Sequence, residues 1–466
     1  MRLVGHVRRR EAKRREDRVV TDRHAHPMTY TDADAARHYE QALDSLLHFR
    51  EDVVTEAAAV LQASPRSVMG NVFRTYLGLL GTEEKDAAEA ATAFEAHCRH
   101  VPSAGLTVRE RMHIEAASCW LGGDMHRAGS ILAELVVAHP RDALALAVGH
   151  QIDFFTGNAA LLRDRIGGAL SAWDTDDPHY GLLQGMYAFG LEEAGHHSLA
   201  ESVGLEAVER NARDVWGIHA VVHAYEMQGR HEDGIRYLDA RTDDWSTGNY
   251  LNVHNWWHYA LYQLATDRTD KVLAVYDASV HHAGSAGAAM ELLDAASLLW
   301  RLYLADKDTG LRWPALADAW AQRDDGAYYA FNDVHAVMAY VGADRISDAE
   351  RLIADREMWL REVGTGRPEL SNVAMTEQIG LPVCRALVAY GRRRYADAVD
   401  LLLPVRHRLH GFGGSHAQRD AVQRTLVESA LRGGRHDLAR TLLSERLNLR
   451  PECPYGRDAR ARLQSA

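Results

Sequence analysis

Cysteine and proline are both scarce in this sequence. Its 466 residues include 11 prolines and four cysteines that stand far apart and form no CxxC pair: Cys98, Cys119, Cys384 and Cys453. Neither a disulfide framework nor a thiolate zinc site is therefore expected. No apolar run approaches the ~18 residues of a membrane-spanning helix, and no apolar signal segment follows the basic start. The sequence predicts a cytoplasmic protein that does not enter a membrane.

An excess of positive charge is also missing. The net charge is −12 and no basic stripe is present, which argues against a nucleic-acid partner. There is no Walker loop, dinucleotide fingerprint, nucleophile elbow or HExxH motif. The unusual feature is the histidine count of 26, so the positions of the histidines carry most of the functional information.

Helical patterning runs from about residue 32 onward, broken at near-regular intervals. The breakers Gly123, Gly157, Gly195, Gly229 and Thr266 lie 34, 38, 34 and 37 residues apart, which brackets the 34-residue tetratricopeptide period. Later breakers are less regular: Asp306, Gly342, Gly391 and Gly434. The pattern predicts an all-α superhelical solenoid of about ten tetratricopeptide-like helix pairs, each of which buries its apolar face by stacking on its neighbours.

The two ends of the chain differ from this pattern. Residues 1–27 carry nine Lys or Arg against four Asp or Glu and almost no apolar periodicity, which indicates a disordered basic leader. A basic tail for an acidic partner is the alternative. The solenoid is expected to be continuous over 28–450, and the Arg-rich residues 451–466 are expected to form a frayed tail.

Histidines concentrate between residues 214 and 260. His219, His223 and Glu226 are spaced i, i+4, i+7 and so share one helix face, and His254 and His258 repeat the i, i+4 spacing in the next unit. Corresponding helices of adjacent units lie side by side. Four imidazoles and a carboxylate are therefore expected to converge on one patch.

Three interpretations of this patch are open. The histidines could form hydrogen bonds between stacked helices. They could carry out metal-free acid/base chemistry or bind substrate. They could also bind a divalent metal such as zinc, with the ligands His219, His223, His254 and His258. The sequence requires no cofactor.

Several other polar residues are candidates for the same groove. By resemblance to the tetratricopeptide repeat, counting back from the turn glycines places His113 in the concave groove and Glu192 at its edge. Asp294 lies on an otherwise apolar helix, where a buried carboxylate needs a partner. His416 follows a Gly-Gly-Ser turn that either cradles an anion or caps a helix through Ser415.

Several segments resemble the tetratricopeptide repeat protein 38 family, found in bacteria and animals. They are HYGLLQGMYAFGLEE (179–193), HAVVHAYEM (219–227), HNWWHYALY (254–262), LDAASLLWRL (293–302) and GGSHAQRD (413–420). The resemblance spans roughly residues 30–445. It implies the α-solenoid fold and a cytosolic protein, and it supplies no activity.

Two functional hypotheses follow. The first is a small-molecule binding protein or enzyme with an enclosed pocket in the groove. Its catalytic candidates are His219, His223, Glu226, His254, His258 and His335. Its substrate-binding candidates are His113, Tyr187, Glu192, Trp256, Asp294 and His416. The second hypothesis is an interaction scaffold that holds a peptide or helix in an open channel. The partner would be a small molecule or a peptide, with a homodimer left open.

Overall fold

The computed structural model describes residues 20–100, 105–323 and 326–465 and is helical throughout. The β interactions among these residues are two isolated bridges, Thr21 with Pro27 and Arg50 with Asn249. The helices of the first half are α2 (Ala33–Leu47), α3 (Val53–Ala63), α4 (Val68–Leu80), α5 (Glu84–His100), α6 (Val108–Leu121), α7 (Met125–Ala138), α8 (Ala143–Phe155), α9 (Ala159–Ala169), α10 (Tyr180–Glu193), α11 (His197–Arg210), α12 (Val215–Met227), α13 (His231–Asp239) and α14 (Thr242–Trp245). Those of the second half are α15 (Asn252–Ala265), α16 (Thr269–Val275), α17 (Ala289–Leu304), α18 (Arg312–Arg323), α19 (Ala330–Gly342), α20 (Ile346–Glu362), α21 (Ser371–Met375), α22 (Leu381–Gly391), α23 (Tyr395–Leu402), α24 (His416–Arg432), α25 (His436–Leu449) and α26 (Pro454–Ser465).

Antiparallel helix pairs are the repeating unit, and each pair turns through a residue with positive φ; the turn between α17 and α18 contains a second one, Gly310. Within the described residues these turns lie at Phe49, Thr82, Gly123, Gly157, Gly195, Gly229, Asp267, Asp306, Asp344, Arg393 and Gly434. The left-handed conformation ends the first helix and redirects the chain into the second. This architecture confirms the predicted all-α, tetratricopeptide-like solenoid.

Three of the predicted turn positions are displaced. The sequence pattern pointed to Thr266, Gly342 and Gly391, but the residues with positive φ are Asp267, Asp344 and Arg393. Gly342 and Gly391 instead end helices α19 and α22, where they allow close helix packing. A Cβ on Gly342 would lie 2.3 Å from Cδ2 of Trp313. Glycine here marks a close contact and not the turn itself.

Short polar side chains start several helices immediately after these turns. Asp124 caps α7 and Asn158 caps α9, each by accepting a hydrogen bond from a backbone N–H of the first helical turn. Asp142 and Asp214 cap the first helices α8 and α12 in the same way. Such caps satisfy N–H groups that otherwise lack partners, and they fix where each helix begins.

The superhelix is wound so tightly that its later helix pairs touch its earlier ones. The amide of Ala289 donates to Glu83, 206 residues away, at 2.9 Å. Asn332 donates to the carbonyl of Thr82, 250 residues away, at 3.0 Å. Further along, the amide of Ser371 donates to the carbonyl of Gly123. The second superhelical turn therefore stacks on the helix-pair turns of the first.

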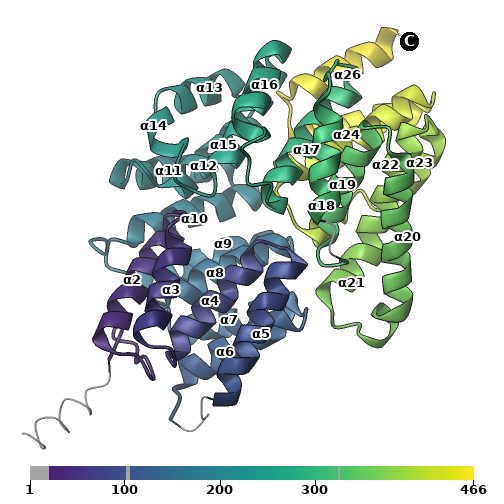
Figure 1. Cartoon of the computed structure of the whole chain (residues 1–466). Helices are drawn as coiled ribbons and strands as arrows, with labels where there is room; N and C mark the ends of the chain where they lie inside the picture. Colours follow the sequence, from purple (N-terminus) through teal and green to yellow (C-terminus); the bar gives the residue numbers. More distant parts are fainter. Residues whose placement is uncertain (1–19, 101–104, 324–325, 466) are drawn as a thin grey trace, which may run out of the picture.

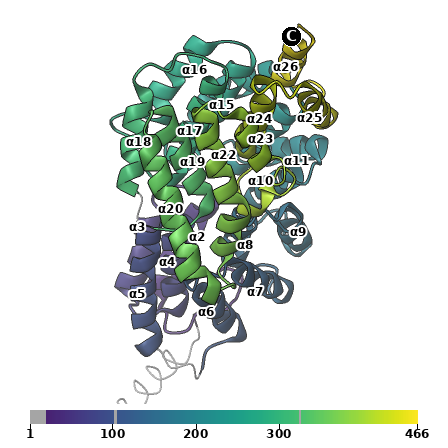
Figure 2. The same cartoon turned by 90° about the vertical axis from the view of Figure 1, so that its right-hand side faces the viewer.

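Gly157 shows how closely the two superhelical turns approach. Its φ is +67°, and a Cβ built on it would lie 1.8 Å from the carbonyl oxygen of His410. Both the backbone conformation and the approaching chain thus require glycine at this position. Figure 1 shows α2–α9 in the lower part of the molecule, α11–α16 above them and α17–α24 beside both. Figure 2 shows the same stacking from the side.

Buried apolar side chains form one continuous cluster that extends from Met28 to Leu463. Such continuity is expected for a solenoid in which each helix pair packs on its neighbours. Within the described part of the chain, no helix combines the length and the apolar character that a bilayer-crossing segment needs.

Both ends of the described chain differ from the sequence-based boundaries. Of the leader predicted over residues 1–27, residues 1–19 lie outside the described residues. Residues 20–27 pack on the solenoid: Asp22 is buried and lies 3.5 Å from Arg109, and the ring of His24 contacts Trp173 at 4.7 Å between centroids. The described solenoid thus begins at residue 20 and not at Met28.

The tail predicted to fray over 451–466 is instead helix α26. Ala459 is fully buried, and the buried carboxylate of Glu428 accepts hydrogen bonds from Tyr455 at 3.0 Å and from Arg462. A weakly apolar helix is held here by charged hydrogen bonds, which apolar patterning does not reveal.

Candidate functional site

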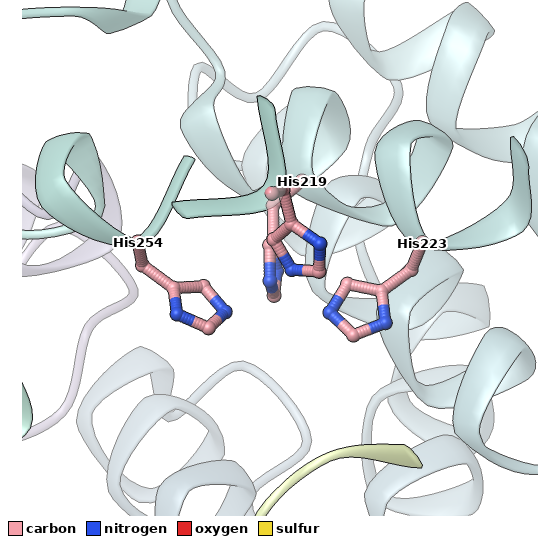
Figure 3. A group of neighbouring side chains, drawn as sticks. His219, His223 and His254 are labelled. Atoms are coloured by element: carbon pink, nitrogen blue, oxygen red, sulfur yellow. The ribbon is translucent and has the colours of Figure 1, made fainter. Parts of the chain in front are cut away.

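Two neighbouring first helices, α12 and α15, carry the four predicted histidines. His223 and His258 are fully buried, His219 is 3% exposed, and His254 is half-buried. One ring nitrogen from each of the four residues lies within 4.8 Å of the corresponding nitrogens of the others. Figure 3 shows the rings of His254 and His223 directed toward a common space beside His219. The i, i+4 spacing on adjacent helices produces this convergence.

Carboxylates lie behind three of the four imidazoles. Nδ1 of His258 hydrogen-bonds to Oε2 of Glu226 at 3.1 Å, and Nδ1 of His254 hydrogen-bonds to Oδ2 of Asp294 at 2.8 Å. Nδ1 of His223 lies 3.3 Å from Oε2 of Glu192, without hydrogen-bond geometry. No carboxylate in the described part of the chain stands behind His219, which distinguishes it from the other three histidines.

Glu192 and Glu226 occupy equivalent repeat positions, each three residues before its turn glycine. Each therefore extends from the last turn of one first helix toward a histidine on the first helix of the next unit. His254 receives its carboxylate from the opposite direction, because Asp294 belongs to the following unit, on α17. Stacking of successive units thus builds the histidine–carboxylate pairs.

Several buried ring nitrogens of the cluster lack a hydrogen-bond partner among the described residues. Both nitrogens of His219, both of His223 and Nε2 of His258 are in this state. A buried, unsatisfied polar group costs about 1–3 kcal/mol. The cluster therefore does not match the interpretation in which neighbouring helices satisfy every imidazole.

Burial controls the charge state of the cluster. It lowers the pKa of His223 to about 4, and it holds the pKa values of His219 and His258 well below the usual value, with the neighbouring histidines adding to the effect. Burial and the neighbouring Glu193 raise the pKa of Glu192 to about 8. The imidazoles of His219, His223 and His258 are accordingly neutral at pH 7, as ligands and proton acceptors must be.

Glu193 behaves differently from its neighbour Glu192. Burial alone would raise the pKa of Glu193, but His416 and Arg419 outweigh burial and hold the pKa below its usual range. Arg419 donates to Oε2 of Glu193 at 3.2 Å, and the amide of His416 donates to Oε1 at 2.7 Å. This pair of interactions joins the start of α24 to the end of α10, across the two superhelical turns.

The ring of His254 is stacked on the indole of Trp257. It lies parallel to the indole of Trp257, with centroids 5.0 Å apart and an interplanar angle of 18°. The indole N–H of Trp257 donates to Ser297 at 2.9 Å. The guanidinium of Arg301 lies over the Trp257 ring, 5.4 Å from its centroid. Together with Asp294, these contacts fix the orientation of His254.

A cavity of about 300 Å³ adjoins the cluster. Its walls come from both superhelical turns and are mostly apolar, with Phe49, Leu77, Leu80, Phe154, Phe189 and Trp216 among them. His219, His254, Asp294 and Gln418 form its polar end, and Arg50, Gln151 and Glu291 also line the cavity. An apolar cavity with a few convergent polar groups is typical of a small-molecule site.

Two other predicted site residues lie near the cluster without joining it. The ring of His335 is buried, and its Nδ1 hydrogen-bonds to the carbonyl of Phe331 at 2.7 Å. Burial lowers the pKa of His335 to about 4. Nε2 of His416 contacts the backbone carbonyl of Glu193 at 2.9 Å. Ser415 caps α24 in a reciprocal arrangement with Gln418, so the Gly-Gly-Ser turn serves as a helix start.

The remaining three predicted residues lie elsewhere. His113 is buried in a separate ion-pair cluster, 3.0 Å from Asp142. Tyr187 packs over Gly167, where an added Cβ would lie 2.6 Å from its ring. The ring of Trp256 packs edge-to-face on Trp245 at 4.6 Å. None of the three lines the cavity, so they are not placed to bind a ligand there.

Sequence reasoning missed Gln418 and the aromatic wall. Gln418 donates to Oδ1 of Asp294 at 3.3 Å and lies two residues beyond the histidine singled out in GGSHAQRD. Phe189 and Trp216 pack around His219, with ring centroids 4.8 and 5.7 Å away. Their helical spacing is that of ordinary core residues, so no sequence signal separates them from the core.

No family model matches the chain. Among solved structures, it is similar to a structure of Naa15/Naa10 bound to HypK-THB, with 12% identity and a TM-score of 0.26, covering 92% of this chain and 64% of that one. It is also similar to the APC/C hetero-tetramer Cut9–Hcn1, with 12% identity and a TM-score of 0.31, covering 93% and 96%. The chain thus spans less than two thirds of the first of these. Membership of the tetratricopeptide repeat protein 38 family stays a prediction from the sequence segments.

Proposed function

We propose that this protein binds a small, largely apolar molecule in the cavity between its superhelical turns and acts on the polar end of that molecule with the histidine cluster. One observation carries the proposal. His219 and His254 lie at the polar end of a mostly apolar cavity of about 300 Å³. An apolar ligand body would displace water from the walls, and its head group would meet imidazole nitrogens.

The geometry supports acid/base chemistry at that end. Nδ1 of His254 is bound to Asp294, so the second ring nitrogen of His254 is the one available to a ligand. A carboxylate that orients an imidazole in this way is a recurrent feature of general bases. His219 has both nitrogens unpartnered and would contact the head group directly. His254 is thus the candidate base and His219 the candidate binding group.

The surroundings of this cavity argue against a helical peptide, because helices of both superhelical turns contribute its walls. The groove here is also crossed by contacts between superhelical turns, such as the hydrogen bond from Tyr329 to the carbonyl of Phe155 at 3.1 Å. These features favour the small-molecule function over the scaffold function.

The test is binding of small amphiphilic probes by the full chain. Octanoate and phenylacetate each combine an apolar body with a polar head of suitable size, and calorimetry should detect saturable binding of at least one of them. Leu80→Trp, at a partly buried wall position, should reduce binding at least tenfold. Leu205→Trp, a partly buried position on α11 outside the cavity, is the matched control and should bind normally.

Two results would contradict the proposal. One is the absence of saturable binding of either probe to the unmodified chain. The other is equal affinity in the Leu80→Trp and Leu205→Trp variants, which would place the bound probe outside the cavity.

A further inference from the structure

We propose that the four-histidine cluster binds one divalent transition-metal ion of the zinc type, with His223, His254 and His258 as permanent ligands and His219 as an exchangeable fourth. This inference deepens the proposed function, on which it rests for the role of the cavity, and it changes the role of His254: with Nε2 on the ion, His254 holds the metal, and the ion replaces it as the group that acts on the head group. The ion would stand at the polar end of the cavity, where it would hold and polarise the head group of the bound molecule.

The separation of the ring nitrogens fits such an ion after a small contraction. Four nitrogens at about 2.0–2.1 Å from a tetrahedral zinc ion lie about 3.4 Å from one another. In the structure the corresponding nitrogens lie within 4.8 Å. Small side-chain rotations would close this gap. They would break no hydrogen bond at His219 or His223, whose ring nitrogens have no partner.

The carboxylates behind the histidines are a second, independent indication. A metal-bound imidazole nearly always donates its other N–H to a carboxylate, a carbonyl or water, which fixes the ring and its tautomer. Glu226 occupies this position behind His258 and Asp294 behind His254, at 3.1 and 2.8 Å. Both bonds use Nδ1, so Nε2 is left as the donor to the ion.

Glu192 is the third carboxylate behind the cluster, and it stands behind His223. Its two carboxyl oxygens have no hydrogen-bond partner, although the residue is fully buried. Oε2 of Glu192 lies 3.3 Å from Nδ1 of His223. A ring rotation that brings Nε2 onto an ion would turn this contact into a hydrogen bond. One bound ion would thereby satisfy Nε2 of His223, Nε2 of His258 and one nitrogen of His219, and Glu192 would pair with Nδ1 of His223.

The donor type selects the class of metal. All four groups are imidazoles, which suit zinc and the neighbouring transition metals, whereas calcium and magnesium require oxygen ligands. A second group of histidine and carboxylate side chains, His24, Asp177 and His179, also lies within ligand distance. It contains only two imidazoles, and Nε2 of His179 lies 3.5 Å from Asp44, so it serves as a comparison site.

His219 is the exchangeable position for two reasons. No carboxylate holds its ring, and it lines the cavity. Catalytic zinc sites keep three protein ligands and one exchangeable position, whereas structural sites use four fixed ligands. The carboxylate, carbonyl or hydroxyl oxygen of an apolar molecule in the cavity would therefore replace His219 on the ion.

Cobalt(II) is the probe, because its visible spectrum reports coordination geometry. The full chain, stripped of metal with a chelator, should bind one Co²⁺ per molecule with the intense absorption of a tetrahedral site, and added Zn²⁺ should abolish that absorption. His258→Ala should abolish binding. Glu226→Gln retains the ligand and changes only the group behind it, so it should weaken binding 10–100-fold. His219→Ala should weaken binding less than either of these changes.

His24→Ala is the control and should leave Co²⁺ binding unchanged. The absence of a tetrahedral Co²⁺ spectrum in the unmodified chain would overturn the inference, and so would equal Co²⁺ affinity in the unmodified chain and Glu226→Gln. The two proposals fail separately. Octanoate binding by a chain that binds no metal would leave the proposed function intact, whereas metal binding without any probe binding would leave only the metal site.

Discussion

Asp294 on α17 hydrogen-bonds through Oδ2 to Nδ1 of His254 on α15, at 2.8 Å and across 40 residues of sequence. Its other oxygen accepts a hydrogen bond from Gln418 on α24, 124 residues further along the chain. One carboxylate therefore links two successive helix pairs to the second superhelical turn. Any displacement of that superhelical turn would change the orientation of His254.

The stability of the metal-free protein should increase when His219 becomes leucine. Both nitrogens of His219 are buried without partners, and leucine removes this penalty of about 1–3 kcal/mol. Urea unfolding in the presence of a chelator should therefore show a higher midpoint for His219→Leu. His258→Leu is the contrast and should lower the midpoint, because it removes the partner of Glu226. A lower midpoint for His219→Leu would show that the packing contacts of the His219 ring stabilise the protein by more than its unpaired nitrogens destabilise it.

Acid stability should depend on the buried ion pair between Asp142 and Arg109. Burial alone would raise the pKa of Asp142, but Arg109 and His113 hold it well below the usual 3.8. The carboxylate of Asp142 therefore binds a proton more tightly in the unfolded chain than in the folded chain. The stability that the pair contributes is fully present above about pH 3.8 and is lost as pH falls toward the folded pKa.

Asp142→Asn tests this prediction. Asparagine retains an oxygen that can cap α8, as Asp142 does through Ala145, but it leaves Arg109 without this charge partner. The substitution should cost about 3–5 kcal/mol near pH 7 and flatten the loss of stability in acid. Urea unfolding of both proteins at several pH values measures the effect. If the stability of the two proteins changed in parallel with pH, the ion pair would not be the cause of the loss of stability in acid.

Contact between the superhelical turns should be measurable at Gly157. Alanine at a positive φ costs about 1–2 kcal/mol, and at Gly157 the added Cβ also meets the carbonyl of His410. Gly434 has a φ of +70° and no neighbouring atom within 4 Å of an added Cβ, so Gly434→Ala measures the conformational cost alone. Chemical unfolding should show a larger loss for Gly157→Ala than for Gly434→Ala. Equal losses would mean that the superhelical turns do not press on each other here.

Residues 20–27 should stabilise the solenoid. Compared with deletion of residues 1–19, deletion of 1–27 should lower the melting temperature. The second deletion removes the contact of Asp22 with Arg109 and that of His24 with Trp173. Equal melting temperatures for the two shortened chains would contradict the packing of residues 20–27.

Local sequence patterns predicted the helical solenoid and much of the candidate site. The 34-residue period reflects helix pairs that contact their neighbours, and the i, i+4 histidine spacing reflects one helix face. Glu226 shares that face with His219 and His223, so its proximity to the cluster also followed from spacing. Each of these relationships joins residues within one unit or between adjacent units.

Relationships between the two superhelical turns could not be predicted in this way. The hydrogen bond between Gln418 on α24 and Asp294 on α17 joins residues 124 positions apart, and no spacing pattern indicates it. The cavity walls likewise combine α4 with α12 and α15, which are distant in sequence. No repeat period encodes which units meet after the superhelix closes on itself.

The stacking of one superhelical turn on the other also limits how this protein can evolve and fold. Most solenoids tolerate the gain or loss of a repeat, because each unit contacts only its neighbours. Here one inserted or deleted unit would shift every later helix pair relative to the earlier pair beneath it, and Gly157 would no longer face His410. The number of units should therefore be fixed. The cavity should also appear late in folding, because contacts over such sequence separations form slowly.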